Sequence, residues 1–146
     1  MNFSKKELSI LIEIVFSILF AIFFLPYFYD NRFETYDLNT SVNKLIQITI
    51  FSIIYFSLAY TLLEIFIKKK LINDERDILI DLKSYKLGYI LYEISLCLFI
   101  GVILSVAIFD SQMYQNSGGL VFMIVLWLVL VSFIKSAYQL YLYRTS

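Results

Sequence analysis

Residues 8–29 read LSILIEIVFSILFAIFFLPYFY, a run in which Glu13 is the only charged residue. A helix of about 20 residues crosses the hydrocarbon core of a bilayer, which is roughly 30 Å thick. The run is long enough to do this, and no small-residue cleavage pattern of the kind that ends a signal peptide follows it. It therefore predicts a first transmembrane helix.

The rest of the chain repeats this pattern. Further apolar runs of similar length lie at about 45–67, 87–109 and 120–143. Of the 146 residues, 60% are hydrophobic and only 16% are charged, which is too apolar for a soluble domain of this size. We expect an all-α integral membrane protein, in which residues 1–146 form a single domain, an antiparallel bundle of four transmembrane helices.

The basic residues of the short loops predict the orientation, because Lys and Arg are retained on the cytoplasmic side during insertion. The loops after the first and third runs hold only Arg32 and Lys44. The two termini and the 68–86 loop hold Lys5, Lys6, Lys68, Lys69, Lys70, Arg76, Lys83, Lys86 and Arg144. Both termini and the 68–86 loop are therefore expected in the cytoplasm.

The 68–86 loop contains a signal for the start of a helix. Asn73 can cap a helix whose first turn carries Asp74, Glu75 and Asp77, so negative charge lies at the positive end of the helix dipole. Apolar residues then recur at helical spacing, namely Ile78, Leu79, Leu82, Tyr85 and Tyr89, with the stem of Lys86. The pattern predicts a short cytoplasmic amphipathic helix that leads into the third span.

The charges of this loop allow three interpretations. Asp74, Asp77 and Asp81 share one helix face and could hold a divalent cation. The loop could instead dock a cytoplasmic protein or lie on anionic lipid. The residues of such a surface are Lys68, Lys69, Lys70, Asp74, Glu75, Arg76, Asp77 and Lys83. We favour the third interpretation, a capped surface helix that orients the third span, since solvated carboxylates beside lysines usually pair or stay in water.

The order of these elements resembles small bacterial four-span proteins of uncharacterised membrane families. The resemblance rests on two spans, then the motif D-E-R-D-x-x-I-x-x-K, then two more spans closing in Q-L-Y-L-Y-R at residues 139–144. The motif residues are Asp74, Glu75, Arg76, Asp77, Ile80 and Lys83. The resemblance implies a bacterial inner-membrane location and, in some members, a neighbouring small DNA-binding regulator. It implies no chemistry and no catalytic residue.

Each predicted span holds one ionisable residue in its cytoplasmic half: Glu13, Glu64, Glu93 and Lys135. A rise of 1.5 Å per residue puts all four roughly 5 to 12 Å from the inner boundary, so they could meet at one level. A glutamate that keeps its proton there would suit a proton or cation relay. We favour a structural interpretation, in which Glu64 reaches the interface while Glu13 and Glu93 pair with Lys135.

The glycine pair and the single proline predict helix ends. Gly118 and Gly119 indicate a turn before the fourth span, although their backbone amides could also form an anion-binding nest. Pro26 lies near the end of the first span, where its missing backbone donor is tolerated.

The composition argues against several function classes. The chain has no His and only Cys97, and we find no nucleophile beside a base and no phosphate loop, so we expect no catalysis, cofactor or metal. Zero net charge and the lack of a basic groove argue against nucleic acid. The sequence favours a noncatalytic helper that binds a partner protein, a lipid or a membrane-active toxin, in a regulatory, accessory or immunity-type role. The alternative is a homo-oligomeric proton- or cation-coupled channel or transporter that uses the intramembrane glutamates.

Overall fold

The computed structural model describes residues 4–35, 37–67, 75–109 and 117–145. Its helices are α1 (Lys5–Asp30), α2 (Leu38–Phe66), α3 (Glu75–Phe109) and α5 (Ser117–Thr145), and these described ranges contain no strand. By length and composition, all four helices can cross a membrane. The predicted all-α class and the four candidate spans are therefore confirmed.

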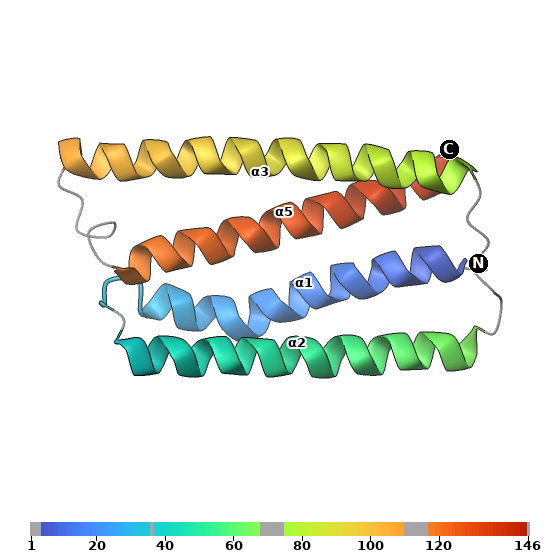
Figure 1. Ribbon diagram of the computed structural model, residues 1–146, viewed down its shortest axis with the longest axis horizontal. Coiled ribbons are helices and arrows are strands. Elements are labelled where there is room, and N and C mark those ends of the chain that lie inside the picture. Colours follow the sequence, from blue (N-terminus) through green and yellow to red (C-terminus); the bar gives the residue numbers. More distant parts are fainter. Residues whose placement is uncertain (1–3, 36, 68–74, 110–116, 146) are drawn as a thin grey trace.

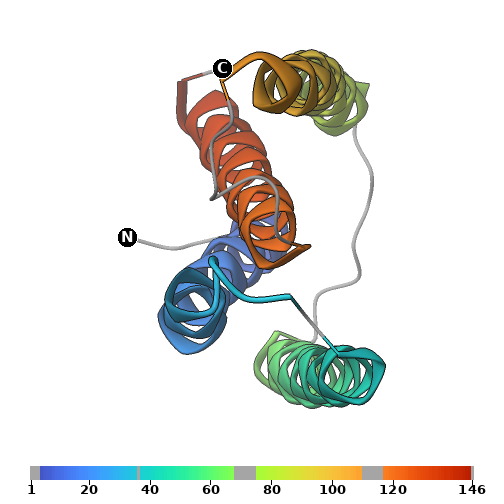
Figure 2. The ribbon, with the colours of Figure 1, turned by 90° about the vertical axis from the view of Figure 1, so that its left-hand side faces the viewer.

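The helices lie along one common direction and alternate in polarity from one to the next in the chain (Figure 1). α1 packs along α5, α5 packs along α3, and α2 makes a smaller contact with α1. Within the described ranges α2 and α3 do not pack against each other, and in the end view the helices follow an open arc in the order α2, α1, α5, α3 (Figure 2). The bundle is therefore open on the side between α2 and α3.

α1 is fixed at both ends and buries one face. Ser4 and Glu7 form a reciprocal capping box at its start, which satisfies two otherwise unpaired amides. The helix continues four residues past Pro26 and ends at Asp30, so the proline lies within the last turns rather than at the end. Its buried residues, at spacings of seven and four, are Ile10, Ser17, Phe24 and Phe28.

Aromatic side chains make the contact between α1 and α2. The Phe16 ring lies 4.6 Å from that of Phe56 and 5.3 Å from that of Tyr55, measured between centroids. The Tyr55 hydroxyl of α2 donates a hydrogen bond to the backbone carbonyl of Ile12 in α1 at 2.8 Å. This bond connects the two helices directly. No residue of α2 with described burial is buried, so α2 is the least enclosed helix of the bundle.

In α3, the helix predicted to lead into the third span is continuous with that span. α3 is one helix of 35 residues, about 52 Å long, and the segment that begins at Glu75 shares its axis with the third span. The sequence contains no Gly or Pro between residues 75 and 87 to interrupt it, and Gly88 packs against the Lys135 stem. The predicted capping residues Asn73 and Asp74 lie outside the described residues.

The predicted apolar stripe of this segment is exposed, and Tyr85 at its edge also contacts Lys135 of α5. Its members Ile78, Leu79, Leu82, Tyr85 and Tyr89 are all exposed. The opposite face is buried, with Ile80 3% exposed and Ser84 fully covered, because this is the face that packs on α5.

The two remaining helix starts differ from the prediction. α2 begins at Leu38 rather than near residue 45, with Asp37 in the N-cap position. Gly118 and Gly119 form no turn before α5 but lie buried in its first turn. The Gly118 amide donates to the Glu34 carbonyl at 3.0 Å, so this donor is used within the fold rather than in an anion nest.

Candidate functional site

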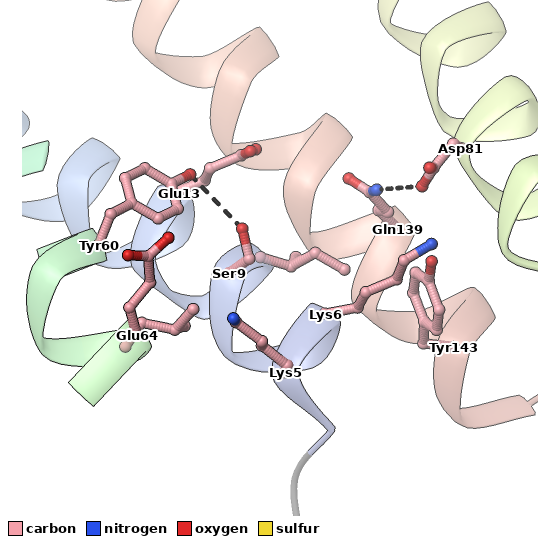
Figure 3. Close-up of a pocket in the computed structure, with 11 residues that line it drawn as sticks. Lys5, Lys6, Ser9, Glu13, Tyr60, Glu64, Asp81, Gln139 and Tyr143 are labelled. Atoms are coloured by element: carbon pink, nitrogen blue, oxygen red, sulfur yellow. Dashed lines mark hydrogen bonds between the residues drawn. The ribbon is translucent and has the colours of Figure 1, made fainter. Parts of the chain in front are cut away.

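A polar cavity of about 280 Å³ lies at the end of the bundle that holds both chain termini. All four helices contribute to it, and Figure 3 shows its polar side chains. The lining residues are Lys5, Lys6, Ser9, Ile10, Glu13, Tyr60, Leu63, Glu64, Asp81, Gln139 and Tyr143. In this polar cavity, ionisable side chains from all four helices converge.

Glu13 lines the cavity and connects α1 with α5. Its Oε2 accepts a hydrogen bond from the Ser136 hydroxyl at 3.0 Å and lies 3.7 Å from Lys135 Nζ. Lys135 Nζ also lies 4.7 Å from the centroid of the Tyr85 ring on α3, a cation–π contact. The structure thus brings Glu13 and Lys135 together, and Lys135 connects α1, α5 and α3.

Glu64 and Glu93 do not join this pair. Glu64 projects from α2 into the polar cavity and makes no ion pair within the described ranges. Glu93 is exposed and lies nine residues after the buried Ser84, about two and a half helical turns, so it points away from α5. Its described interaction is with Tyr89, one turn earlier on α3. Of the four predicted intramembrane charges, those described as being in contact are Glu13 and Lys135.

Charged and polar side chains at the same end form further contacts between helices. They include Lys6 Nζ to Asp77 Oδ2 at 2.9 Å, Arg144 Nε to Glu7 Oε1 at 3.4 Å, and Gln139 Nε2 donating to Asp81 Oδ1 at 2.8 Å. The Tyr143 hydroxyl is buried near the Asp77 and Asp81 carboxylates without a hydrogen bond of good geometry among the described atoms. The sequence did not predict these pairings, since hydropathy does not determine how each helix is rotated about its axis.

The predicted docking surface is only partly described. Lys68, Lys69, Lys70 and Asp74 lie outside the described residues. Glu75, Arg76 and Lys83 are exposed, and Arg76 Nη2 donates to the Tyr143 carbonyl at 3.1 Å.

The cation site considered at Asp74, Asp77 and Asp81 gains no support from this geometry. Lys6 pairs with the Asp77 carboxylate and Gln139 donates to that of Asp81. The part of the chain that the structure describes holds no group of three His, Cys, Asp or Glu side chains able to bind a metal ion.

A second pocket, of about 250 Å³, continues the same face of α1 toward the middle of the bundle. Ser9 and Glu13 line the polar cavity, and Ser17, one turn further, lines this serine-lined pocket. Its lining residues are Phe16, Ser17, Phe20, Ser52, Val125, Leu128, Val129 and Ser132. The Ser17 hydroxyl donates to the Glu13 carbonyl and the Ser52 hydroxyl to that of Ile48, so both donors are already satisfied. Apart from the Ser132 hydroxyl, which lies 3.4 Å from that of Ser17, the pocket therefore presents an essentially apolar wall.

Charges and hydrogen-bonding groups at the mouth, with an apolar wall further in, suit the binding of an amphiphile or of a partner side chain. The chain matches no protein-family model, no curated protein sequence and no solved structure.

Proposed function

We propose that this protein is a noncatalytic helper in a bacterial inner membrane that binds a second membrane protein through the outward face of α3. Glu93 is the observation that carries the proposal. It lies on the exposed side of a helix that, within the described ranges, packs along α5 and reaches α1 through the Lys6–Asp77 ion pair near its start. A partner that covers this face would take Glu93 out of contact with lipid.

The depth of Glu93 makes lipid a poor neighbour. If the inner boundary lies near Leu87, Glu93 is roughly 9 Å inside the span. A carboxylate within a transmembrane segment costs about 2.5 to 3.5 kcal/mol on insertion scales, and such residues normally face protein or water. A helix that offers a base or hydroxyl groups to Glu93 would offset this cost.

Apolar residues continue the same face along α3. Exposed Leu82, Tyr89, Leu96 and Ile100 share it with Glu93. Exposed apolar side chains alone do not identify a partner, because lipid tails cover them equally well. The Glu93 carboxylate among these apolar residues favours a protein neighbour over lipid. The apolar residues then provide the surface on which that protein packs.

The distribution of basic residues supports the proposed orientation. Lys5, Lys6 and Arg144 occur at the end that also holds the start of α3, so the positive-inside rule favours cytoplasmic termini. In that orientation the helper could regulate, accompany or protect its partner from within the membrane.

Photo-crosslinking in native membranes tests the proposal. A photoreactive residue at Leu96, three residues after Glu93, should capture one protein in stoichiometric yield, which mass spectrometry would identify. The matched control is Ser95, which lies on the α5 side of α3, eleven residues after buried Ser84, and should give crosslinks within the chain.

The Glu93→Gln variant provides the second measurement. We expect it to reduce the Leu96 crosslink while leaving the chain in the membrane. Capture of lipid alone at Leu96 would contradict the proposal. Capture of a second copy in a defined ring would instead support the oligomeric channel or transporter.

A further inference from the structure

We propose that the polar cavity binds the headgroup of a zwitterionic aminophospholipid, with the lipid phosphate at Lys5, its ammonium at Glu64 and an acyl chain in the serine-lined pocket. This site is separate from the outward face of α3. It does not depend on the partner proposed for that face.

Among the charged side chains that line the cavity, one cation and one anion have no partner within the described chain. Lys6 is held by Asp77, Glu13 by Ser136 and Lys135, and Asp81 by Gln139. Lys5 and Glu64 are the two charged lining residues that make no ion pair or hydrogen bond with the rest of the described chain.

The two groups reach the cavity from different helices. Lys5 extends from the start of α1 and Glu64 from α2, on the side of the cavity where these two helices meet (Figure 3). The Ser9 and Tyr60 hydroxyls line the same cavity, 3.5 Å apart. A ligand that carries an anion and a cation a few bonds apart would satisfy both charges at once.

An aminophospholipid headgroup has this chemistry. Its phosphate oxygens accept hydrogen bonds from an ammonium such as that of Lys5, and its own ammonium donates to a carboxylate such as that of Glu64. A polyol headgroup lacks the cation, and a choline headgroup has no N–H group to donate. A site built from Lys5 and Glu64 should therefore distinguish these headgroups.

The fold also provides a place for the acyl chain. Ser9, Glu13 and Ser17 follow one another at four-residue spacing on α1, so the polar cavity and the serine-lined pocket occupy one face of this helix. The polar cavity lies at the end of the bundle and the apolar pocket lies deeper. This is the arrangement that a phospholipid has in one leaflet.

Native mass spectrometry of the full chain in a neutral detergent tests the proposal. The delipidated protein is titrated with dioleoyl-phosphatidylethanolamine, dioleoyl-phosphatidylcholine or dioleoyl-phosphatidylglycerol. We expect the first phosphatidylethanolamine molecule to bind about tenfold more tightly than either of the others, as one charge-assisted hydrogen bond at the headgroup would give. Equal affinities, or a preference for phosphatidylglycerol, would overturn the proposal without any variant.

Two substitutions assign the headgroup contacts. In Glu64→Gln the preference for phosphatidylethanolamine should fall to within about twofold, because the neutral amide loses the charge-assisted bond. In Lys5→Gln the affinities for all three phospholipids should fall together, because each has a phosphate. A Glu64→Gln protein that keeps its headgroup preference would refute the assigned contact.

Matched controls make the same chemical changes elsewhere. Glu34 lies between α1 and α2, at the other end of α1 from Lys5, and its carbonyl contacts the start of α5; Lys86 is exposed on α3. Glu34→Gln and Lys86→Gln should both retain the wild-type preference. Melting temperatures should be nearly unchanged in Lys5→Gln and Glu64→Gln, since neither residue has a described partner to lose.

Discussion

The Glu13 carboxylate connects α1 with α5. Its Oε2 accepts a hydrogen bond from Ser136 and forms an ion pair with Lys135. We expect Lys135→Met to lower the free energy of unfolding of the detergent-solubilised protein by roughly 1 to 3 kcal/mol. The range is below that of a fully buried pair, since Lys135 and Glu13 keep 21% and 34% of their side-chain surface exposed. Adding Glu13→Gln should restore part of the loss.

Glu93→Gln is the control for this coupling. Glu93 faces away from Lys135, so the effects of Lys135→Met and Glu93→Gln should add within about 0.5 kcal/mol. If both double variants were additive, the 3.7 Å contact of Lys135 would carry no energy and the lysine would simply extend toward the headgroups.

Gly118 joins the start of α5 to the loop after α1. A Cβ atom added there would lie 2.6 Å from the Glu34 carbonyl oxygen and also meet that of Asn31. We expect Gly118→Ala to destabilise the protein by roughly 1 to 3 kcal/mol, because backbone atoms must move to admit the methyl group. The melting temperature of purified protein measures this loss.

Gly101 provides the matched substitution. No atom lies within 4 Å of a Cβ added at this position of α3. Gly101→Ala should therefore be neutral or stabilising by up to about 1 kcal/mol, as helix propensity favours Ala. Equal melting temperatures for the two variants would contradict the close contact at Gly118.

Sequence reasoning identifies these residues only in part. Glu13 and Lys135 are conspicuous as charges within apolar runs, and the depth of each follows from helical rise. Their contact also depends on the rotation of each helix, which the sequence does not reveal. Glu93 has a comparable depth but lies on the outward side of α3, so depth alone does not predict whether Lys135 pairs with Glu93 or with Glu13.

At the scale of elements, α3 is the longest helix and carries two opposite faces along its first turns. We expect spin labels at residues 78, 82, 85 and 89 to be mobile and accessible and labels at residues 80, 84 and 88 to be immobile. The 3.6-residue period should run through residue 87 without a shift, because α3 is continuous there. A flat profile before residue 87 would indicate a separate linker.

The four helices could be predicted from hydropathy, but their open arrangement could not. In water, the apolar face of a helix identifies its core side, whereas in a bilayer lipid covers an apolar face as well as a neighbouring helix does. The apolar residues of α2 therefore give no signal that, within the described ranges, this helix packs on α1. The outward stripe of α3 has the same ambiguity.

At the scale of the whole molecule, the two ends of the bundle differ in the number of their basic residues and in the contacts that these residues make. At the end away from the termini, Arg32 lies over the Tyr29 ring at 3.8 Å and Lys44 over the Tyr27 ring at 3.8 Å. Such cation–π contacts suit side chains at a membrane interface. Lys5, Lys83 and Lys86 instead lie at the end with the termini, which makes that end the more basic one.

This asymmetry predicts the orientation of the protein. In a Cys97→Ser background, cysteines at Ser4 and Lys83 should react with an impermeant thiol reagent only after the inner membrane is opened, and one at Asn39 in intact cells whose outer membrane is permeable. These positions are exposed, whereas the neighbouring Ser84 is fully buried and would remain unlabelled on either side. Labelling at Lys83 from the periplasm would reverse the topology. It would also place the polar cavity, and the phospholipid headgroup proposed for it, in the outer leaflet, because the cavity and Lys83 lie at the same end of the bundle.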